Sequence, residues 1–152
     1  GNDVFIGGSG ADSIRGSFGA DTLTGGAGAD TFLYRNAAES SGTHHDTIVG
    51  FDYSQDKIDL PVSVSGFSAT PSVTQGSLST ASFDADLAAA VNGALDPNKA
   101  LLFTASAGDY AGKTFLVVDG NGDGSYQVDQ DYVFLMQAPT QPISTADTGF
   151  LV

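Results

Sequence analysis

Aspartate and glycine recur with a period of nine residues at the start of the chain, and both residue types can supply ligands to a metal ion. The four aspartates are Asp3, Asp12, Asp21 and Asp30, and the glycine two residues before each is Gly1, Gly10, Gly19 or Gly28. Glycine lets the backbone turn tightly and aim its carbonyl oxygens at one place, where each aspartate adds a carboxylate. Calcium is bound by oxygen ligands of this kind. The spacing therefore predicts a row of calcium-binding loops, which also includes Gly8.

Two positions after each aspartate stands a large apolar residue: Phe5, Ile14, Leu23 or Phe32. Because alternate side chains of a strand point to opposite faces, each is expected to point inward from a short strand. One loop offers fewer than the roughly six to eight oxygens that calcium takes, so stacked loops would share an ion. If successive strands alternate between two sheets, loops on one side come from every second unit. The predicted pairs are then Asp3 with Asp21 and Asp12 with Asp30.

The full units begin at Gly7, Gly16 and Gly25, after the tail of an earlier unit in residues 1–6. Their pattern resembles the RTX (repeats-in-toxin) family, whose Gly-Gly-x-Gly-x-Asp-x-apolar-x unit binds calcium in a parallel β-roll. The resemblance implies several calcium ions. A flexible glycine-rich linker is the alternative, but a linker needs neither periodic Asp nor periodic apolar residues. In one unit Ser17 replaces the second glycine, so this loop is expected to bind more weakly or Phe18 to pack against a neighbour.

The segment after the repeats, with Asp46-Thr-Ile-Val-Gly-Phe and Asp56-Lys-Ile-Asp-Leu, resembles the one that follows the repeats in serralysin-type secreted RTX proteins. Residues 47–51 and 57–60 are predicted to be short strands. Four aspartates here either complete the last calcium shells or only form turns: Asp46, Asp52, Asp56 and Asp59. His44 and His45 are expected to be exposed loop residues, because no third zinc ligand accompanies them.

Residues 61–82 are rich in Ser and Thr and contain two prolines, which predicts irregular structure or an edge strand. Ser82 is expected to cap a helix over about 83–92, with Gly93 as its terminator. Strands are predicted over 99–104, 113–118 and 132–136.

The loop that starts Asp119-Gly-Asn-Gly-Asp-Gly resembles the start of an EF-hand loop, although no helices flank it. Its candidate calcium ligands are Asp119, Asn121, Asp123, Asp129 and Asp131. A hairpin turn that favours Asp and Gly is the alternative. The strand, turn and strand here also resemble the terminal modules of some bacterial surface RTX proteins.

Composition narrows the possible partners. The 152 residues include 18 acidic and five basic ones, giving a formal net charge of −13. Without a basic patch, nucleic acid is not an expected partner, and no apolar run approaches the ~20 residues that span a bilayer. The chain has no cysteine, which excludes disulfides and cysteine-based zinc sites. Glu39 is the only Glu, and so many Asp residues in glycine-rich turns suggest ligands for hard cations. An acidic surface kept for solubility is the alternative.

These features predict a mainly β fold with two parts in one continuous domain. Residues 1–34 form a parallel β-roll of nonapeptide repeats, and residues 35–152 form a β-rich C-terminal cap and secretion region with one short helix at about 83–92. We expect a monomer.

The resemblance implies a calcium-binding C-terminal module of a secreted RTX protein, which folds on extracellular calcium. The ending Asp147-Thr-Gly-Phe-Leu-Val resembles the uncleaved export signal of type I secretion substrates, although a final edge strand has the same composition. The implied partner is the type I secretion machinery, and the implied location is outside the cell or on the bacterial surface. The alternative is an adhesin or surface-layer module that binds polysaccharide and is held rigid by calcium. No constellation of nucleophile and base indicates an enzyme, so any catalysis would belong to N-terminal domains outside this sequence.

Overall fold

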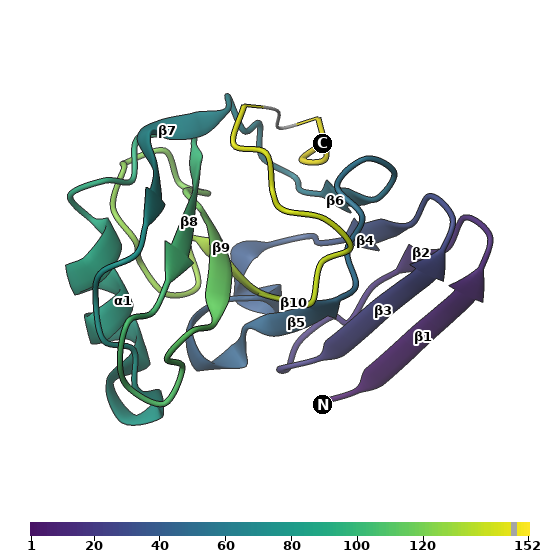
Figure 1. Cartoon of the computed structure of the whole chain (residues 1–152), viewed down its shortest axis with the longest axis horizontal. Helices are drawn as coiled ribbons and strands as arrows, with labels where there is room; N and C mark the ends of the chain where they lie inside the picture. The colour runs from purple at the N-terminus through teal and green to yellow at the C-terminus, as the bar shows by residue number, and fades with distance from the viewer. Residues whose placement is uncertain (147–148) are drawn as a thin grey trace.

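A computed structural model describes residues 1–146 and 149–152 of the chain, and it is mainly β (Figure 1). Its described strands form two sheets, one of seven strands in the order β1-β3-β5-β10-β9-β8-β7 and one of three in the order β2-β4-β6. The elements are β1 (Val4–Ser9), β2 (Ser13–Ile14), β3 (Thr22–Ala27), β4 (Thr31–Leu33), β5 (Asp46–Val49), β6 (Lys57–Asp59), β7 (Phe67–Val73), α1 (Phe83–Val91), β8 (Ala100–Thr104), β9 (Thr114–Val118) and β10 (Tyr132–Gln137).

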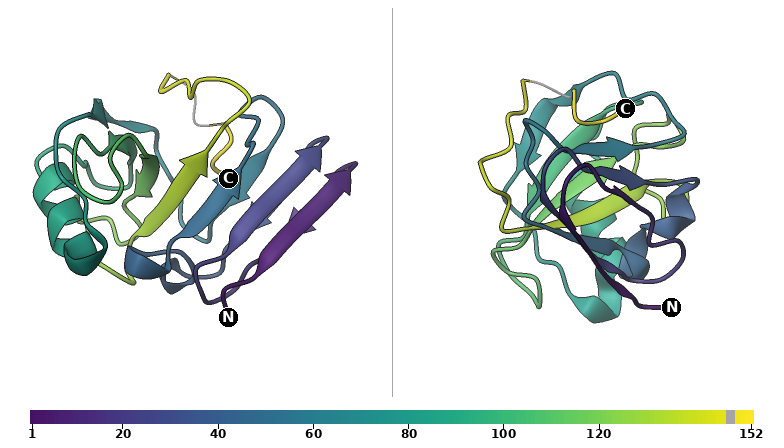
Figure 2. Two further views of the ribbon diagram at one scale, coloured as in Figure 1. Left: turned by 60° about the horizontal axis from the view of Figure 1, so that its bottom comes forward. Right: turned by 90° about the vertical axis from the view of Figure 1, so that its right-hand side faces the viewer.

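The N-terminal strands alternate between the two sheets, which confirms the predicted β-roll (Figure 2). In the larger sheet, β1, β3 and β5 are parallel, with Phe5 opposite Leu23 and Leu23 opposite Ile48. In the smaller sheet, β2, β4 and β6 are parallel, with Phe32 opposite Ile58. The apolar residue of each repeat thus stacks on that of the next repeat but one. The same stacking continues past residue 34 into β5 and β6.

The cap extends the larger sheet without a break. Strand β10 runs parallel to β5 on one side and antiparallel to β9 on the other, and β8 pairs antiparallel with β9. Strand β7 is an edge strand of the larger sheet, as the composition of residues 61–82 predicted. It contains Pro71, whose missing backbone N–H costs least on an edge strand. Roll and cap therefore share one sheet, and Figure 1 shows α1 at the end opposite to the roll.

Two hydrophobic clusters fill the interior. One runs through the roll into the cap and includes Leu23, Phe32, Ile48 and Ile58, all fully buried. The other lies under α1, where three helix residues pack against the sheet: Phe83, Leu87 and Val91. No described helix is long and apolar enough to cross a bilayer.

The helix begins as predicted but is bounded differently. Ser82 makes no side-chain capping bond to the backbone, and its hydroxyl donates instead to Asp86 at 2.8 Å. The helix ends at Val91 and is closed by Asn92, whose N–H donates to the carbonyl of Ala88 at 3.0 Å. Ser82 thus stands at the N-cap position, as predicted, but without a capping bond to the backbone, and Gly93 directly follows the C-cap residue Asn92.

The C-terminal residues lie beside β6. The N–H of Ile58 donates to the carbonyl of Phe150 at 2.7 Å, and the N–H of Val152 donates back to Ile58 at 3.1 Å. Phe150 is buried, with its ring 4.9 Å from that of Tyr53. Of the predicted export signal, residues 147 and 148 lie outside the described residues. Its last residues add a short parallel pairing to the smaller sheet.

Candidate calcium-binding site

The repeat aspartates form two columns, one along each side of the roll, in which each residue holds the next. The backbone N–H of Asp3 donates to Oδ1 of Asp21 at 2.7 Å, and that of Asp21 donates to Oδ1 of Asp46 at 2.9 Å. In the other column, Asp12 N–H donates to Oδ1 of Asp30 at 2.9 Å, and Asp30 N–H to Oδ1 of Asp56 at 3.0 Å. The structure thus places the predicted pairs, Asp3 with Asp21 and Asp12 with Asp30, side by side.

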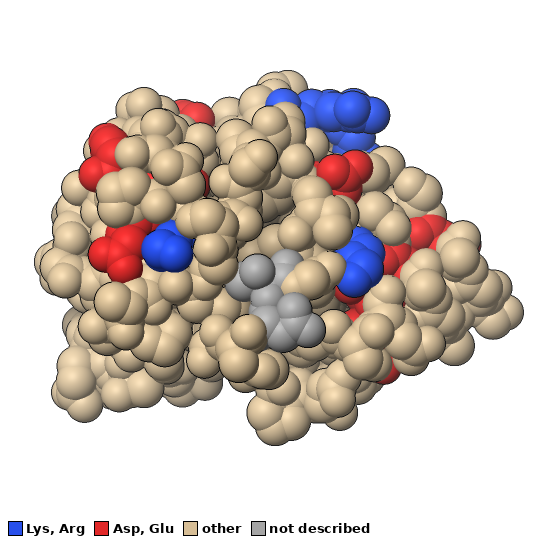
Figure 3. All heavy atoms as spheres, turned by 90° about the horizontal axis from the view of Figure 1, so that it is seen from above, with Lys and Arg blue, Asp and Glu red and all other residues tan. Residues whose placement is uncertain are grey.

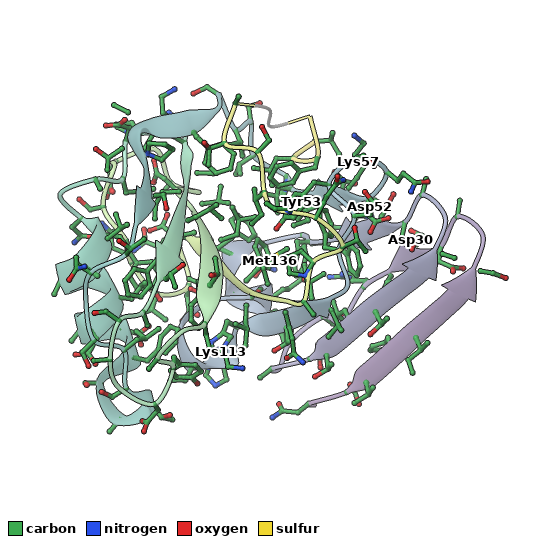
Figure 4. All side chains as sticks on the ribbon, viewed as in Figure 1. Asp30, Asp52, Tyr53, Lys57, Lys113 and Met136 are labelled. Atoms are coloured by element: carbon green, nitrogen blue, oxygen red, sulfur yellow. The ribbon has the colours of Figure 1, made fainter. Side chains whose placement is uncertain are left out.

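The other carboxylate oxygen of three repeat aspartates is buried without a hydrogen-bond partner. These atoms are Oδ2 of Asp12, Asp21 and Asp30. Asp21 and Asp30 are themselves almost wholly buried, and Asp30 is labelled in Figure 4. A buried carboxylate oxygen without a donor is costly, because its lost hydration is not replaced. A bound cation would replace it.

Glycine lets each of these carboxylates pack directly against the backbone. A Cβ atom built on Gly7 would lie 2.5 Å from Oδ2 of Asp12, and one on Gly16 or Gly25 would lie closer than 3.0 Å to Oδ2 of Asp21 or Asp30. No larger residue fits at these three positions unless the aspartate moves. These glycines were not among the predicted site residues, although each is the first residue of its unit.

Backbone carbonyls of one turn face glycines of the next turn in the same column. A Cβ atom on Gly28 would collide with the carbonyl oxygen of Gly10, and one on Gly26 with that of Gly8. Gly19 faces the carbonyl of Gly1 in the same way and has a φ of +132°, which favours glycine. Carbonyl and carboxylate oxygens therefore gather between stacked loops. This all-oxygen donor set fits calcium.

The loops of Asp3 and Asp21 depart from the other two. Asp3 lies at the open edge of the roll, and its side chain is 57% exposed. Ser17 adopts a φ of +70°, a strained conformation for a non-glycine residue. Phe18 is 60% exposed, so the expectation that it packs against a neighbour was wrong.

Asp46 and Asp56 stand in the columns, but both of their carboxylate oxygens have donors. Oδ2 of Asp46 accepts the hydroxyl of Tyr34 at 2.9 Å, and Oδ2 of Asp56 accepts the N–H of Asp52 at 2.9 Å. Burial raises the pKa of the Asp46 carboxyl to about 7. Tyr34 was not recognised from sequence as part of this arrangement.

Asp52 and Asp59 lie outside the columns. Asp52 accepts hydrogen bonds from the N–H of Ser54 at 2.9 Å and from its hydroxyl, and these bonds lower the pKa of Asp52. Its geometry is that of a turn. Asp59 is a half-buried residue of β6.

The Asp119 loop has a different geometry. Asp119 and Asp131 are buried, yet their oxygens accept backbone N–H groups: Asn98 at 2.6 Å, Gly122 at 3.1 Å and Gly124 at 3.3 Å for Asp119, and Gly120 at 2.8 Å and Gln127 at 2.6 Å for Asp131. Burial raises the pKa of Asp131 to about 6. Both oxygens of Asp119 and of Asp131 therefore have donors, unlike Oδ2 of the three repeat aspartates.

The exposed side chains of Asn121 and Asp123 lie together and are bonded to Gln127. The Asn121 amide donates to the Gln127 side chain at 2.7 Å, and Asp123 accepts from Gln127 at 2.6 Å. Asp129 is exposed, with its backbone N–H on the Ser41 hydroxyl. The segment is a turn between β9 and β10, and calcium binding by it stays a prediction.

The two histidines differ in environment. His44 is exposed, as expected, but His45 is only 7% exposed, so that expectation was wrong. The His45 ring stacks on Phe83 at 4.9 Å and meets the edge of Phe115 at 5.2 Å. This burial lowers the pKa of His45. His45 is a core residue rather than a metal ligand.

Comparison with known families bears on the repeat region. Residues 1–32 match the model of the RTX calcium-binding nonapeptide repeat, in four copies. Comparison with curated proteins finds no match to the chain.

Proposed function

Because its first 32 residues are RTX calcium-binding nonapeptide repeats, we propose that this chain is the calcium-triggered C-terminal module of a secreted protein. In this proposal the repeats fold when they meet extracellular calcium, and the end of the chain carries a type I secretion signal. The functional residues are ligands rather than catalysts. Any enzymatic activity would belong to domains outside this chain.

The observation that carries the proposal is the set of buried, unpartnered oxygens on Asp12, Asp21 and Asp30. Without a cation, each roll turn would bury carboxylate charge that no protein group offsets. Folding of the roll should therefore be coupled to metal binding. Extracellular calcium modules bind at about 10⁻⁴–10⁻³ M, far above the free calcium inside a cell.

The position of the C-terminus supports recognition of the signal before folding. Phe150 and Leu151 are buried in the folded chain, where they are closed off from a receptor. An unfolded chain would expose them. The net negative charge also favours an unfolded state at low calcium, because the acidic side chains repel one another in the compact chain. The few basic side chains lie apart from one another on the face shown in Figure 3, so they offset little of this repulsion.

Calcium titration of the full chain after EGTA treatment tests calcium coupling. We expect far-ultraviolet circular dichroism to show strand content rising with calcium and falling again with EGTA. Asp21→Asn should raise the calcium midpoint, whereas Asp109→Asn removes the same charge from an exposed site in the cap and should leave it unchanged. Full strand content without calcium, with a melt that millimolar calcium does not shift, would refute the proposal.

Deletion of residues 140–152 tests the secretion role in cells. Lost export supports the signal, whereas retained export with lost cell-surface attachment supports the polysaccharide- or surface-binding alternative. Since the deletion also removes packing by Phe150, Leu87→Ala is the matched control. It destabilises the cap by about 2–5 kcal/mol and leaves the C-terminus intact, so its export should be retained.

A further inference from the structure

We propose that the calcium array ends at Asp21 and Asp30, and that Asp46 and Asp56 are metal-free ends of the two columns. In their places, the Tyr34 hydroxyl and the Asp52 N–H supply the positive partner that calcium supplies in the repeats. This inference rests on the proposed function, because it concerns where metal binding stops.

The two terminal aspartates are structural equivalents of the repeat aspartates. Oδ1 of Asp46 accepts the N–H of Asp21, and Oδ1 of Asp56 accepts the N–H of Asp30, as in every earlier step of the columns. The following residue is equivalent too, because Thr47 N–H donates to the Asp21 carbonyl at 2.8 Å, as Thr22 N–H does to Asp3 at 2.9 Å. The backbone therefore does not distinguish a ligand from an end.

The second carboxylate oxygen makes the distinction. In three repeat aspartates Oδ2 is buried and has no donor, whereas in Asp46 and Asp56 it accepts a hydrogen bond of 2.9 Å. A hydrogen directed at that oxygen repels a cation on the same side. Asp46 and Asp56 are as buried as Asp21 and Asp30, so the donor on Oδ2, and not burial, separates the ends of the columns from the repeats.

The loops before the terminal aspartates also lack the glycine against which each repeat carboxylate packs. Five positions before the repeat aspartates stand Gly7, Gly16 and Gly25, whereas five before Asp46 and Asp56 stand Ser41 and Phe51. In the repeats, even one Cβ atom at that glycine would collide with the carboxylate. The change from glycine therefore accompanies the change from an unpartnered to a partnered oxygen.

The Tyr34 hydroxyl, which is the partner of Asp46, is held in place by the packing of its ring. Tyr34 is 3% exposed, and its ring lies 4.9 Å from Phe134 and 6.4 Å from Tyr132. These rings come from β10, so the cap orients the hydroxyl that closes the column. Since a tyrosine hydroxyl both donates and accepts, Asn at position 46 could keep both hydrogen bonds.

The test counts calcium ions bound to the full chain by equilibrium dialysis. Asp46→Asn should bind as many ions as the wild type, with a midpoint within about twofold, whereas Asp21→Asn should bind fewer. Loss of an ion in Asp46→Asn that remains folded by circular dichroism overturns the inference. A wild type that binds no calcium refutes the proposed function instead.

A crystal structure of the wild type grown with calcium tests the same point without a variant. We expect anomalous scattering from ions beside Asp12, Asp21 and Asp30, and none at the terminal aspartates. An ion within about 2.6 Å of a carboxylate oxygen of Asp46 or Asp56 is a coordination distance and overturns the inference.

Discussion

Substitution of Gly25 by alanine tests the shape of the calcium loop without changing its charge. The added Cβ would lie 2.7 Å from Cγ and 2.8 Å from Cβ of Asp30, which is fully buried. Asp30 cannot retreat freely, because its Oδ1 accepts the N–H of Asp12 and its own N–H is bound to Asp56. Overpacking at such a site costs about 1–3 kcal/mol.

That cost sets the expected change in calcium response. Since 1.4 kcal/mol corresponds to a tenfold change in an equilibrium constant, Gly25→Ala should raise the calcium midpoint by about fivefold to about 150-fold. Far-ultraviolet circular dichroism during calcium titration measures the midpoint. Gly93→Ala is the control, because a Cβ atom there would meet nothing within 4 Å. If the Gly25→Ala midpoint stays within twofold of the wild type, the close packing of Asp30 against residue 25 is not needed for calcium binding.

Three further predictions concern the cap. In EGTA, amide hydrogen exchange should be fast over residues 1–33 but slow in β8 to β10, because among the described residues the buried carboxylate oxygens without a partner all lie in the roll; uniform fast exchange would contradict this. Because burial lowers the pKa of His45, the unfolded chain binds its proton first as pH falls below about 6.5, so stability at saturating calcium should decrease there. Urea unfolding should show a smaller decrease in His45→Gln than in His44→Gln, and equal decreases would refute the assignment. Phe150→Ala should lower the unfolding free energy by about 3–5 kcal/mol without changing the number of bound ions; a fall in ion count would show that the C-terminus contributes to a site.

The roll could be predicted from sequence because its information is local. Every repeat carries its own glycines, its aspartate and its apolar residue, so a period of nine defines both the strands and their alternation. The continuation into β5 and β6 is harder to recognise, since Asp46 and Asp56 do not keep that period. The surviving signal is the Asp-x-Ile spacing, in which Ile48 and Ile58 take the places of Leu23 and Phe32.

Other features depend on contacts that no local pattern contains. The burial of His45 comes from rings at positions 83, 110 and 115, which fold around it from separate elements. The Asp119 loop shows the opposite difficulty, since calcium loops and tight turns favour the same Asp and Gly residues. The structural difference from the repeat loops is that both oxygens of Asp119 and Asp131 accept N–H groups, whereas Oδ2 of three repeat aspartates accepts none.

The pairing of the C-terminus with β6 has a consequence for the order of folding. The bridge joins Ile58 to Leu151 across most of the chain, whereas the contacts between successive roll turns span only about two repeats. Contacts between distant residues form slowly, because a long loop must close first. The smaller sheet can therefore assemble turn by turn, but its last edge stays open until the two distant segments meet. This edge and the pairing of β5 with β10 depend on loop closures of similar length, and the final residues remain accessible until the edge forms.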